Sequence, residues 1–200
     1  MVEVMTGTTI IAVSYEEGVI IGCDTRTSVG DYVANRLTNK LYKLSDRIYC
    51  CRSGSAADTQ IVARIISSNL KYHSYIEESL PTVKRVATMG KKLIYKYPQL
   101  LAGLIIAGYD EKEGGCIYSI NLGGTIVKQE WTIGGSGSRF LYGYCDANWR
   151  PNMTKDEKFE FVKKAVSLAI SRDSYSGGCI RMAIISKDNV EKFYFPGNEI

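Results

Sequence analysis

One stretch near the amino terminus determines how the whole chain is interpreted: Gly7-Thr8-Thr9-Ile10-Ile11-Ala12-Val13. Two threonines lead directly into an apolar run that is typical of a buried strand. A threonine hydroxyl becomes a good nucleophile only beside a base, and one available base is the threonine's own α-amino group. Here that amine is held in the Gly7–Thr8 peptide bond. Either Gly-Thr-Thr simply begins a strand, or residues 1–7 are a propeptide and cleavage before Thr8 releases the nucleophile.

The length and composition are those of one globular domain with a substantial core. The formal net charge of +4 is spread along the chain, so it gives little support for a nucleic-acid partner. The longest apolar run, Leu100 to Tyr109, is too short to span a bilayer, and residues 1–7 have no basic segment typical of a secretory signal. We therefore expect neither nucleic acid nor a membrane among its partners.

The six cysteines contain no CxxC pair and have no histidine-rich context, which favours buried reduced thiols over zinc ligands or disulfides. Cys50 and Cys51 are adjacent in a predicted strand and should point to opposite faces. The single histidine, His73, falls in a helical pattern away from the cysteines, and we interpret it as structural or superficial. This pattern predicts a reducing intracellular compartment and no metal site.

The apolar periodicity predicts strands, two helices, strands, one long helix and two final strands. Strands are expected at residues 8–14, 19–25, 39–44, 47–51, 103–109, 115–121, 125–129, 131–134, 180–186 and 190–195, with a loop at 29–38. Helices are expected up to about residue 75, at 81–97 with Pro81 opening the helix, at 139–147, and from the capping box Thr154-Lys155-Asp156-Glu157 to residue 172. The expected fold class is α+β, a four-layer αββα sandwich of two antiparallel sheets flanked by helices, formed by residues 8–200 as a single domain.

Apolar stripes on the first two predicted helices are assigned to the core. The first stripe consists of Ile61, Ile65 and Leu70, with Val62 and Ile66 beside them. The second consists of Val83, Val86, Gly90, Leu93 and Tyr97. Neither stripe contains a cofactor-binding pattern.

Two charged residues lie at strand ends where a charge is costly to bury. Asp24 follows an apolar strand, and a carboxylate there needs a partner unless it only caps the turn. Lys40 begins the next predicted strand, where most lysines are simply solvated. The segment Arg52-Ser53-Gly54-Ser55-Ala56-Ala57-Asp58 then joins a strand to a helix. Small residues at such a turn present backbone N–H groups suited to binding an oxyanion.

Six short motifs follow one another in a set order: Gly7-Thr8-Thr9-Ile10, Gly22-Cys23-Asp24-Thr25-Arg26, Asn39-Lys40-Leu41, Cys51-Arg52-Ser53-Gly54-Ser55-Ala56-Ala57-Asp58, Gly134-Gly135-Ser136-Gly137-Ser138 and Arg172-Asp173-Ser174-Tyr175-Ser176-Gly177-Gly178. Each is weak alone, but the ordered set resembles the catalytic β subunits of the proteasome 20S core particle, which are N-terminal-nucleophile hydrolases. The resemblance runs from Gly7 to about Phe195. The segment from Cys50 to Gln60 resembles the β1, caspase-like type, which cuts after acidic residues.

The resemblance implies a threonine endopeptidase, made as a zymogen, that frees Thr8 by cutting its own Gly7–Thr8 bond. Thr8 would attack the peptide carbonyl, Lys40 would favour the ionised hydroxyl, and Asp24 would hold Lys40 in place. The Gly54 N–H would stabilise the oxyanion. Three supporting residues would orient the amine and a water molecule: Ser136, Asp173 and Ser176.

The resemblance also implies how substrate binds. Ser28, Gly54 and Ala56 would hold the substrate backbone as an added strand, a mode suited to unfolded chains. Ser28 stands where the family commonly has threonine, a change of little weight for a main-chain contact. Arg52, at the base of the first pocket, would select a carboxylate side chain before the cut. The alternative for Arg52 is a rim arginine with no role in selection.

The implied partners are other proteasome α and β subunits in stacked seven-membered rings, regulatory caps acting through the α rings, and unfolded, ubiquitin-targeted polypeptides as substrates. The implied location is the cytoplasm and nucleus, and no metal or organic cofactor is implied. Three alternatives stay open: a structural ring subunit without activity, another N-terminal-nucleophile enzyme such as a bacterial-type protease or an amidohydrolase, and a non-enzymatic binding domain. A structural subunit would be expected to lose the Gly-Thr junction, the lysine or the aspartate, and this chain keeps all three.

Overall fold

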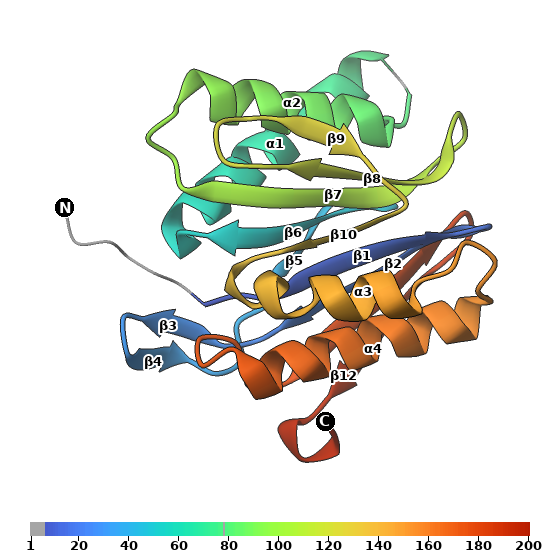
Figure 1. Cartoon of the computed structure of the whole chain (residues 1–200). Coiled ribbons are helices and arrows are strands. Elements are labelled where there is room, and N and C mark those ends of the chain that lie inside the picture. Colours follow the sequence, from blue (N-terminus) through green and yellow to red (C-terminus); the bar gives the residue numbers. More distant parts are fainter. Residues whose placement is uncertain (1–6, 78) are drawn as a thin grey trace.

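The computed structural model describes residues 7–77 and 79–200. Two helices, two antiparallel sheets and two further helices are stacked in four layers (Figure 1). The α+β sandwich predicted from the sequence is therefore confirmed. The predicted propeptide, residues 1–7, lies outside the described residues apart from Gly7.

One sheet combines two strands from the beginning of the chain, two from its end, and β10 from between them. Its order is β10 (Trp131–Gly134), β1 (Ile10–Tyr15), β2 (Gly18–Asp24), β11 (Ile180–Ser186) and β12 (Val190–Phe195). Strand β2 is buried along its whole length, as its unbroken apolar sequence predicts for a strand covered on both faces. The register places Ile10 opposite both Cys23 and Gly134, so the start of β1 lies beside the end of β2 and the end of β10.

The other sheet is formed by the middle of the chain. Its order is β5 (Leu41–Ser45), β6 (Ile48–Gly54), β7 (Ala102–Asp110), β8 (Gly114–Ile120) and β9 (Ile126–Lys128). All neighbouring strands are antiparallel and follow one another in the chain. Strand β6 ends at Gly54, at the same end of the sandwich where β1 begins.

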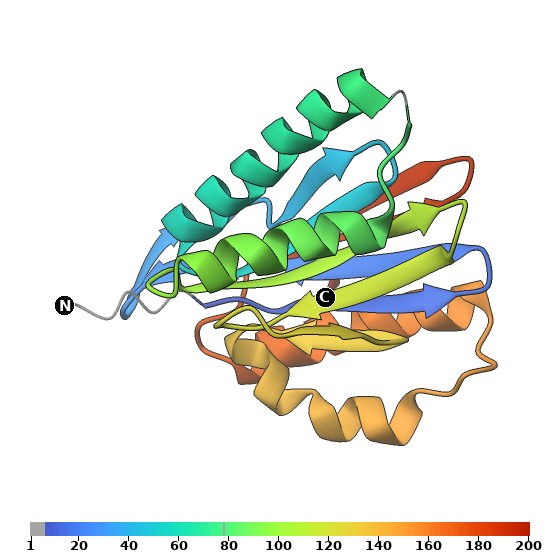
Figure 2. The same cartoon turned by 90° about the horizontal axis from the view of Figure 1, so that it is seen from above.

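The helices cover the outer faces of the sheets. Helices α1 (Ala56–Glu77) and α2 (Val83–Lys96) lie over β5–β9, as seen from above in Figure 2. Helix α4 (Lys155–Arg172) packs on β1 and β2, with α3 (Tyr142–Asn148) and the 3-10 turn η1 (Ser136–Phe140) beside it. A second 3-10 turn, η2 (Gly197–Glu199), follows β12. Within the described ranges, no helix is long and apolar enough to cross a membrane.

Three buried clusters correspond to the three spaces between the four layers. Cys50 packs with α1 and α2 on the outer side of its sheet, whereas Cys51 packs in the space between the two sheets. The predicted opposite orientation of these two neighbours is therefore confirmed. All six cysteines are free and buried.

Both predicted core stripes are partly wrong. In the second stripe, Tyr97 is 39% exposed and follows the last residue of α2. The first stripe differs more. Val62, Ile66 and Leu70 are buried against the sheet, but the side chains of Ile61 and Ile65 are 53% and 38% exposed. Each residue of a helix is rotated by about 100° from the one before it, so neighbouring apolar stripes cannot both face the same sheet. The stripe that contains Val62 packs inward, and Ile61 and Ile65 lie on an outer flank of α1.

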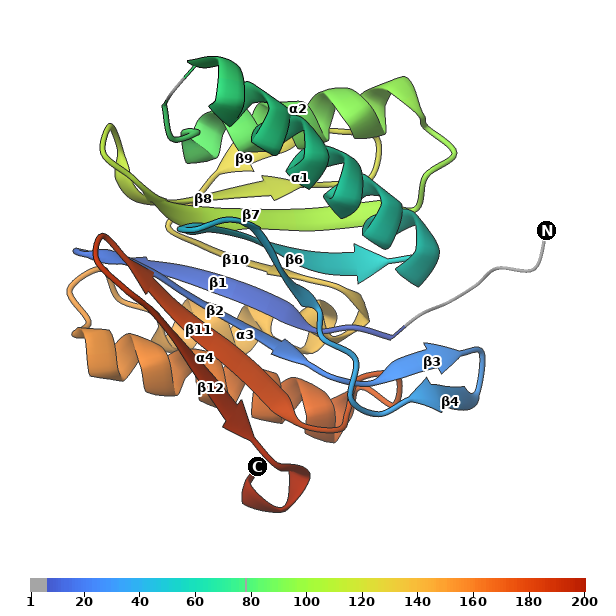
Figure 3. The ribbon, with the colours of Figure 1, turned by 180° about the vertical axis from the view of Figure 1, so that it is seen from behind.

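Two local predictions need correction and one is confirmed. Residues 29–38, predicted as a loop, contain part of a hairpin formed by β3 (Thr27–Val29) and β4 (Tyr32–Asn35), which projects beyond the sheets (Figure 3). Pro81 precedes α2 instead of opening it, because the Thr82 side chain accepts the N-cap hydrogen bond from the Arg85 N–H. The capping box of Thr154 and Glu157 is present at α4.

Burial makes five of the six thiols unreactive in the folded chain. It raises the pKa of Cys23, Cys50, Cys116 and Cys145 to about 12 and that of Cys51 well above its usual value. The thiolate is the reactive form, so iodoacetamide at pH 8 should leave these five cysteines unlabelled. The same reagent in denaturing urea should label all six cysteines, as counted by intact mass. Labelling of any of the five in the folded chain would contradict this prediction.

Candidate active site

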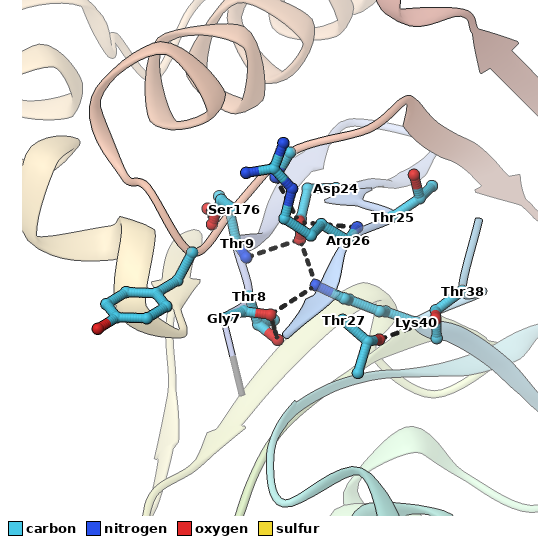
Figure 4. Close-up of polar contacts among 12 residues, drawn as sticks. Gly7, Thr8, Thr9, Asp24, Thr25, Arg26, Thr27, Thr38, Lys40 and Ser176 are labelled. Atoms are coloured by element: carbon cyan, nitrogen blue, oxygen red, sulfur yellow. Dashed lines mark hydrogen bonds and ion pairs between the residues drawn. The ribbon is translucent and has the colours of Figure 1, made fainter. Parts of the chain in front are cut away.

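Polar residues from five separate segments meet at one end of the sandwich; Figure 4 labels Thr8, Thr9, Asp24, Lys40 and Ser176 among them. Thr8 and Thr9 lead into β1, Asp24 ends β2 and Lys40 precedes β5. Ser136 begins η1, directly after β10, and Asp173 and Ser176 lie in the loop between α4 and β11. The register of β1 between β2 and β10 explains why these distant segments converge.

Asp24 and Lys40 form a buried ion pair. The Lys40 Nζ lies 2.6 Å from Asp24 Oδ1, and the two side chains are 6% and 0% exposed. Asp24 Oδ1 also accepts from the Thr9 N–H at 2.9 Å, and Oδ2 accepts from the N–H groups of Gly177 and Arg26 at 3.0 and 3.2 Å. A buried carboxylate is costly unless both oxygens are satisfied. The carboxylate is therefore fixed at both oxygens, and the predicted partner of Asp24 is present.

Two donors converge on the carbonyl oxygen of Gly7. The Thr8 hydroxyl donates to it at 2.6 Å, and Lys40 Nζ donates to it at 3.0 Å. The Gly7 N–H is held in turn by Ser28 Oγ at 3.0 Å. The carbonyl oxygen of the peptide bond predicted to be cut is thus bound by both a hydroxyl and a buried ammonium. A hydrogen bond from its own N–H fixes Gly7, the residue before that bond.

A second chain of hydrogen bonds lies on the other side of Thr8. Ser136 Oγ accepts from the Thr8 N–H at 3.0 Å and donates to Asp173 Oδ2 at 2.7 Å. Ser176 Oγ donates to the same carboxylate oxygen at 2.7 Å and lies 2.7 Å from Thr9 Oγ1. This network positions the nitrogen of Thr8, while Lys40 and Asp24 lie toward the Gly7 carbonyl.

Arg52 lies on the same face of its sheet as Lys40. The Arg52 N–H donates to the Lys40 carbonyl at 3.1 Å, so the two residues are opposite each other in the ladder, and opposite residues project from one face. The guanidinium donates to the Asn39 carbonyl at 2.8 Å and lies 5.8 Å from the centre of the Tyr42 ring. The structure thus places an arginine close to the lysine of the site.

Gly54 and Ala56 lie at the end of β6 and the start of α1, which border the site. Gly54 has a φ of +106°, and a Cβ there would lie 2.3 Å from the Leu101 carbonyl oxygen, so only glycine fits. Across residues 7–77 and 79–200, no three His, Cys, Asp or Glu side chains are grouped as a metal site would require.

Three residues that donate to Asp24 were not selected from the sequence as site residues: Thr9, Arg26 and Gly177. Thr9 links both networks, because its N–H donates to Asp24 and its hydroxyl contacts Ser176. Gly177 supplies an N–H to Asp24, and a Cβ at this position would lie 2.3 Å from Arg26 Cζ. Thr9 is uncharged and begins an apolar strand pattern, so nothing in the sequence distinguishes it from other strand threonines. The double glycine after Ser176 was the available signal for Gly177.

Comparison with known proteins gives the family of the chain. The family model described as "Proteasome subunit" matches residues 4–185. The chain belongs to the proteasome subunit family. The matched range contains every site residue discussed above, so the assignment covers the site as well as the fold.

Individual proteasome subunits are similar over nearly the whole chain. The probable proteasome subunit beta type-1 of Encephalitozoon cuniculi is 52% identical over 196 residues, which are 98% of this chain and 96% of that protein. The protein of the same description in Schizosaccharomyces pombe is 53% identical and covers 96% of this chain and 86% of its own length. Proteasome subunit beta type-1 of Saccharomyces cerevisiae is 46% identical, covering 98% and 92%. The similarity is thus to β-type subunits of the family.

The buried ion pair gives a prediction about stability. Asp24→Ala leaves Lys40 buried without its carboxylate and should lower the free energy of unfolding by about 3–5 kcal/mol. The matched control is Asp46→Ala, because Asp46 pairs with Lys43 at 2.9 Å in an exposed ion pair, and its loss should cost at most about 1 kcal/mol. Urea unfolding of the isolated chain followed by circular dichroism measures both. Equal losses in the two variants would contradict the role of the buried pair.

Proposed function

We propose that this chain is a threonine endopeptidase of the proteasome core, with Thr8 as its nucleophile after the Gly7–Thr8 bond is cut. The observation that carries the proposal is the meeting of the Thr8 hydroxyl and the Lys40 ammonium at one carbonyl oxygen, that of Gly7. A structural subunit has no need of a buried lysine aimed at that peptide bond. The family membership supports the same assignment.

The first step is the cleavage of the chain by itself. Thr8 Oγ bonds to the Gly7 carbonyl carbon, and Lys40 stabilises the negative charge that develops on the Gly7 oxygen. The C–N bond then breaks, and the Thr8 nitrogen takes up the proton that the hydroxyl gave up, leaving Gly7 attached to Thr8 Oγ as an ester. Water hydrolyses this ester, which returns the hydroxyl and leaves Gly7 with a carboxylate and Thr8 with a free amine. Ser28 keeps Gly7 in position through its N–H.

The second function is the cleavage of other polypeptides. The freed Thr8 amine accepts the hydroxyl proton and later passes it to the leaving nitrogen. Ser136, Asp173 and Ser176 hold that amine and a water molecule, since Ser136 already contacts the Thr8 nitrogen. Asp24 holds Lys40 near the hydroxyl, and the Gly54 N–H stabilises the oxyanion. No metal or organic cofactor takes part in these steps.

We propose that the site prefers an acidic residue immediately before the cut. Arg52 lies on the face that carries Lys40, and we place the pocket for that residue beside its guanidinium. A planar guanidinium favours a carboxylate over neutral or cationic side chains. Ser28, Gly54 and Ala56 hold the substrate backbone as an added strand.

The working unit proposed for this chain is an assembly with other proteasome subunits. We place the subunit in the stacked seven-membered rings of α and β subunits, with regulatory caps on the α rings and unfolded, ubiquitin-targeted proteins as substrates. The proposed location is the cytoplasm and nucleus. A closed chamber would restrict cleavage to unfolded chains, since the site itself binds mainly backbone.

The state of the amino terminus tests the nucleophile. In assembled active particles, intact mass and N-terminal sequencing should show a subunit that begins at Thr8. Thr8→Ala should keep residues 1–7 attached and abolish cleavage after acidic residues, because it removes the hydroxyl. A subunit that keeps residues 1–7 in mature, active particles would overturn the proposal and leave a structural ring member.

Reversal of one charge tests the acidic preference. Arg52→Glu should lower kcat/KM for peptides cut after Asp by about tenfold or more relative to peptides cut after Leu, since a carboxylate at this position repels a like charge. The matched control is Arg64→Glu, which makes the same change at an exposed position on α1. If both variants keep the wild-type ratio, Arg52 is a rim arginine without a role in selection.

A further inference from the structure

A pocket with a volume of about 270 Å3 lies where the edge strands β5 and β12 of the two sheets face each other. Residues of β5, β6, β11 and β12 line it, together with Asn39. Among the described residues of its lining there is none of those proposed to bind substrate or to act in catalysis. The pocket is therefore separate from the candidate active site.

Three cationic side chains enter this pocket from three different strands, β5, β11 and β12. Each of them lies opposite a residue whose side chain packs between the two sheets, and opposite residues project from the same face. The pairs are Lys43 with Tyr49, Arg181 with Cys23 and Lys192 with Ala183. The three positive charges therefore point into one space between the sheets.

Two of these cations have no carboxylate partner in the part of the chain that the structure describes. Arg181 Nε is a buried donor without a hydrogen-bond partner, and Lys192 Nζ lies 5.7 Å from the centre of the Tyr49 ring. Lys43 is paired at 2.9 Å, but with the exposed Asp46. No acidic side chain occurs among the described residues that line the pocket. The charges of Arg181 and Lys192 are thus uncompensated by the protein.

The charge and the size of the pocket both favour a compact anion. A cleft lined by charges of one sign raises the local concentration of the opposite ion. A guanidinium can bind two phosphate oxygens at once, and an ammonium binds phosphate as a point charge. The volume of about 270 Å3 is below the roughly 300–1,000 Å3 of pockets that enclose drug-sized ligands. A short phosphate chain therefore fits better than a whole nucleotide.

We propose that this pocket binds a di- or triphosphate group between Lys43, Arg181 and Lys192. The ligand is either a free inorganic polyphosphate or the phosphate chain of a nucleotide whose base remains outside the pocket. The inference goes beyond the proposed function and does not depend on it, because the two sites share no residue.

Isothermal titration calorimetry of the full chain tests the binding. The probes are inorganic phosphate, tripolyphosphate and ATP at one low ionic strength, because salt screens such contacts. Tripolyphosphate should bind with a stoichiometry of one, and inorganic phosphate about tenfold more weakly, since it brings fewer oxygens to the cations. Equal affinities for ATP and tripolyphosphate would assign recognition to the phosphate chain, and tighter binding of ATP would identify a nucleotide as the source. Failure of both to bind would overturn the proposal.

Two variants locate the bound anion. Arg181→Gln and Lys192→Gln should each weaken tripolyphosphate binding by about tenfold or more, the loss expected for one hydrogen bond between charged groups. Lys192 is exposed, so its variant gives an answer even if the Arg181 variant does not fold. The matched control is Arg64→Gln, an exposed position of α1 outside the pocket, which should keep the wild-type Kd. Equal Kd values for the wild type and both pocket variants would mean that the anion binds elsewhere.

Titration of assembled particles distinguishes a small ligand from a neighbouring subunit. The difference between wild-type and Lys192→Gln particles should persist after assembly. A difference that is present in the isolated chain and absent in particles would overturn the proposal and assign the pocket to an acidic segment of an adjacent subunit. Neither titration measures proteolysis, so a failure here leaves the proposed protease function standing, and a failure of the Thr8 test leaves the anion site standing.

Discussion

The site depends on the ion pair between Asp24 and Lys40, which brings a positive charge into an otherwise buried end of the sandwich. An ammonium is costly to bury alone, and the carboxylate that compensates it is itself held by three backbone N–H groups. Those N–H groups come from three separate segments of the chain. The ion pair is therefore fully hydrogen-bonded only when the segment with Thr9 and the loop with Gly177 are both packed against Asp24.

The two hydrogen-bond networks around Thr8 contact different atoms. The network centred on Asp24 contacts the carbonyl that precedes Thr8, through Lys40, and the network centred on Asp173 contacts the Thr8 nitrogen, through Ser136. Thr9 connects them, because its backbone contacts one carboxylate and its hydroxyl contacts the serine bound to the other. A small shift of β1 would thus disturb both networks together.

Much of this arrangement is predictable from the sequence for physical reasons. A carboxylate at the end of a buried strand requires a partner, which is why the apolar run before Asp24 is enough to single that residue out. Ser136 and Asp173 are different, because each is an ordinary loop residue and only the resemblance to a family brings them forward. Thr9 was missed since nothing local distinguishes it from any strand threonine. Ile61 and Ile65 were assigned wrongly because helical periodicity shows that a stripe exists but not which of two adjacent stripes meets the sheet.

The two roles proposed for the Thr8 nitrogen make activation of the chain irreversible. In the proposed mechanism, the Thr8 nitrogen is first part of the peptide bond that is broken and afterwards acts as the base. The base is therefore unavailable until residues 1–7 have been removed. Removal of residues 1–7 by hydrolysis cannot be undone by the folded chain. Under this proposal each molecule matures only once, because the folded chain has no means of re-forming the bond that was cut.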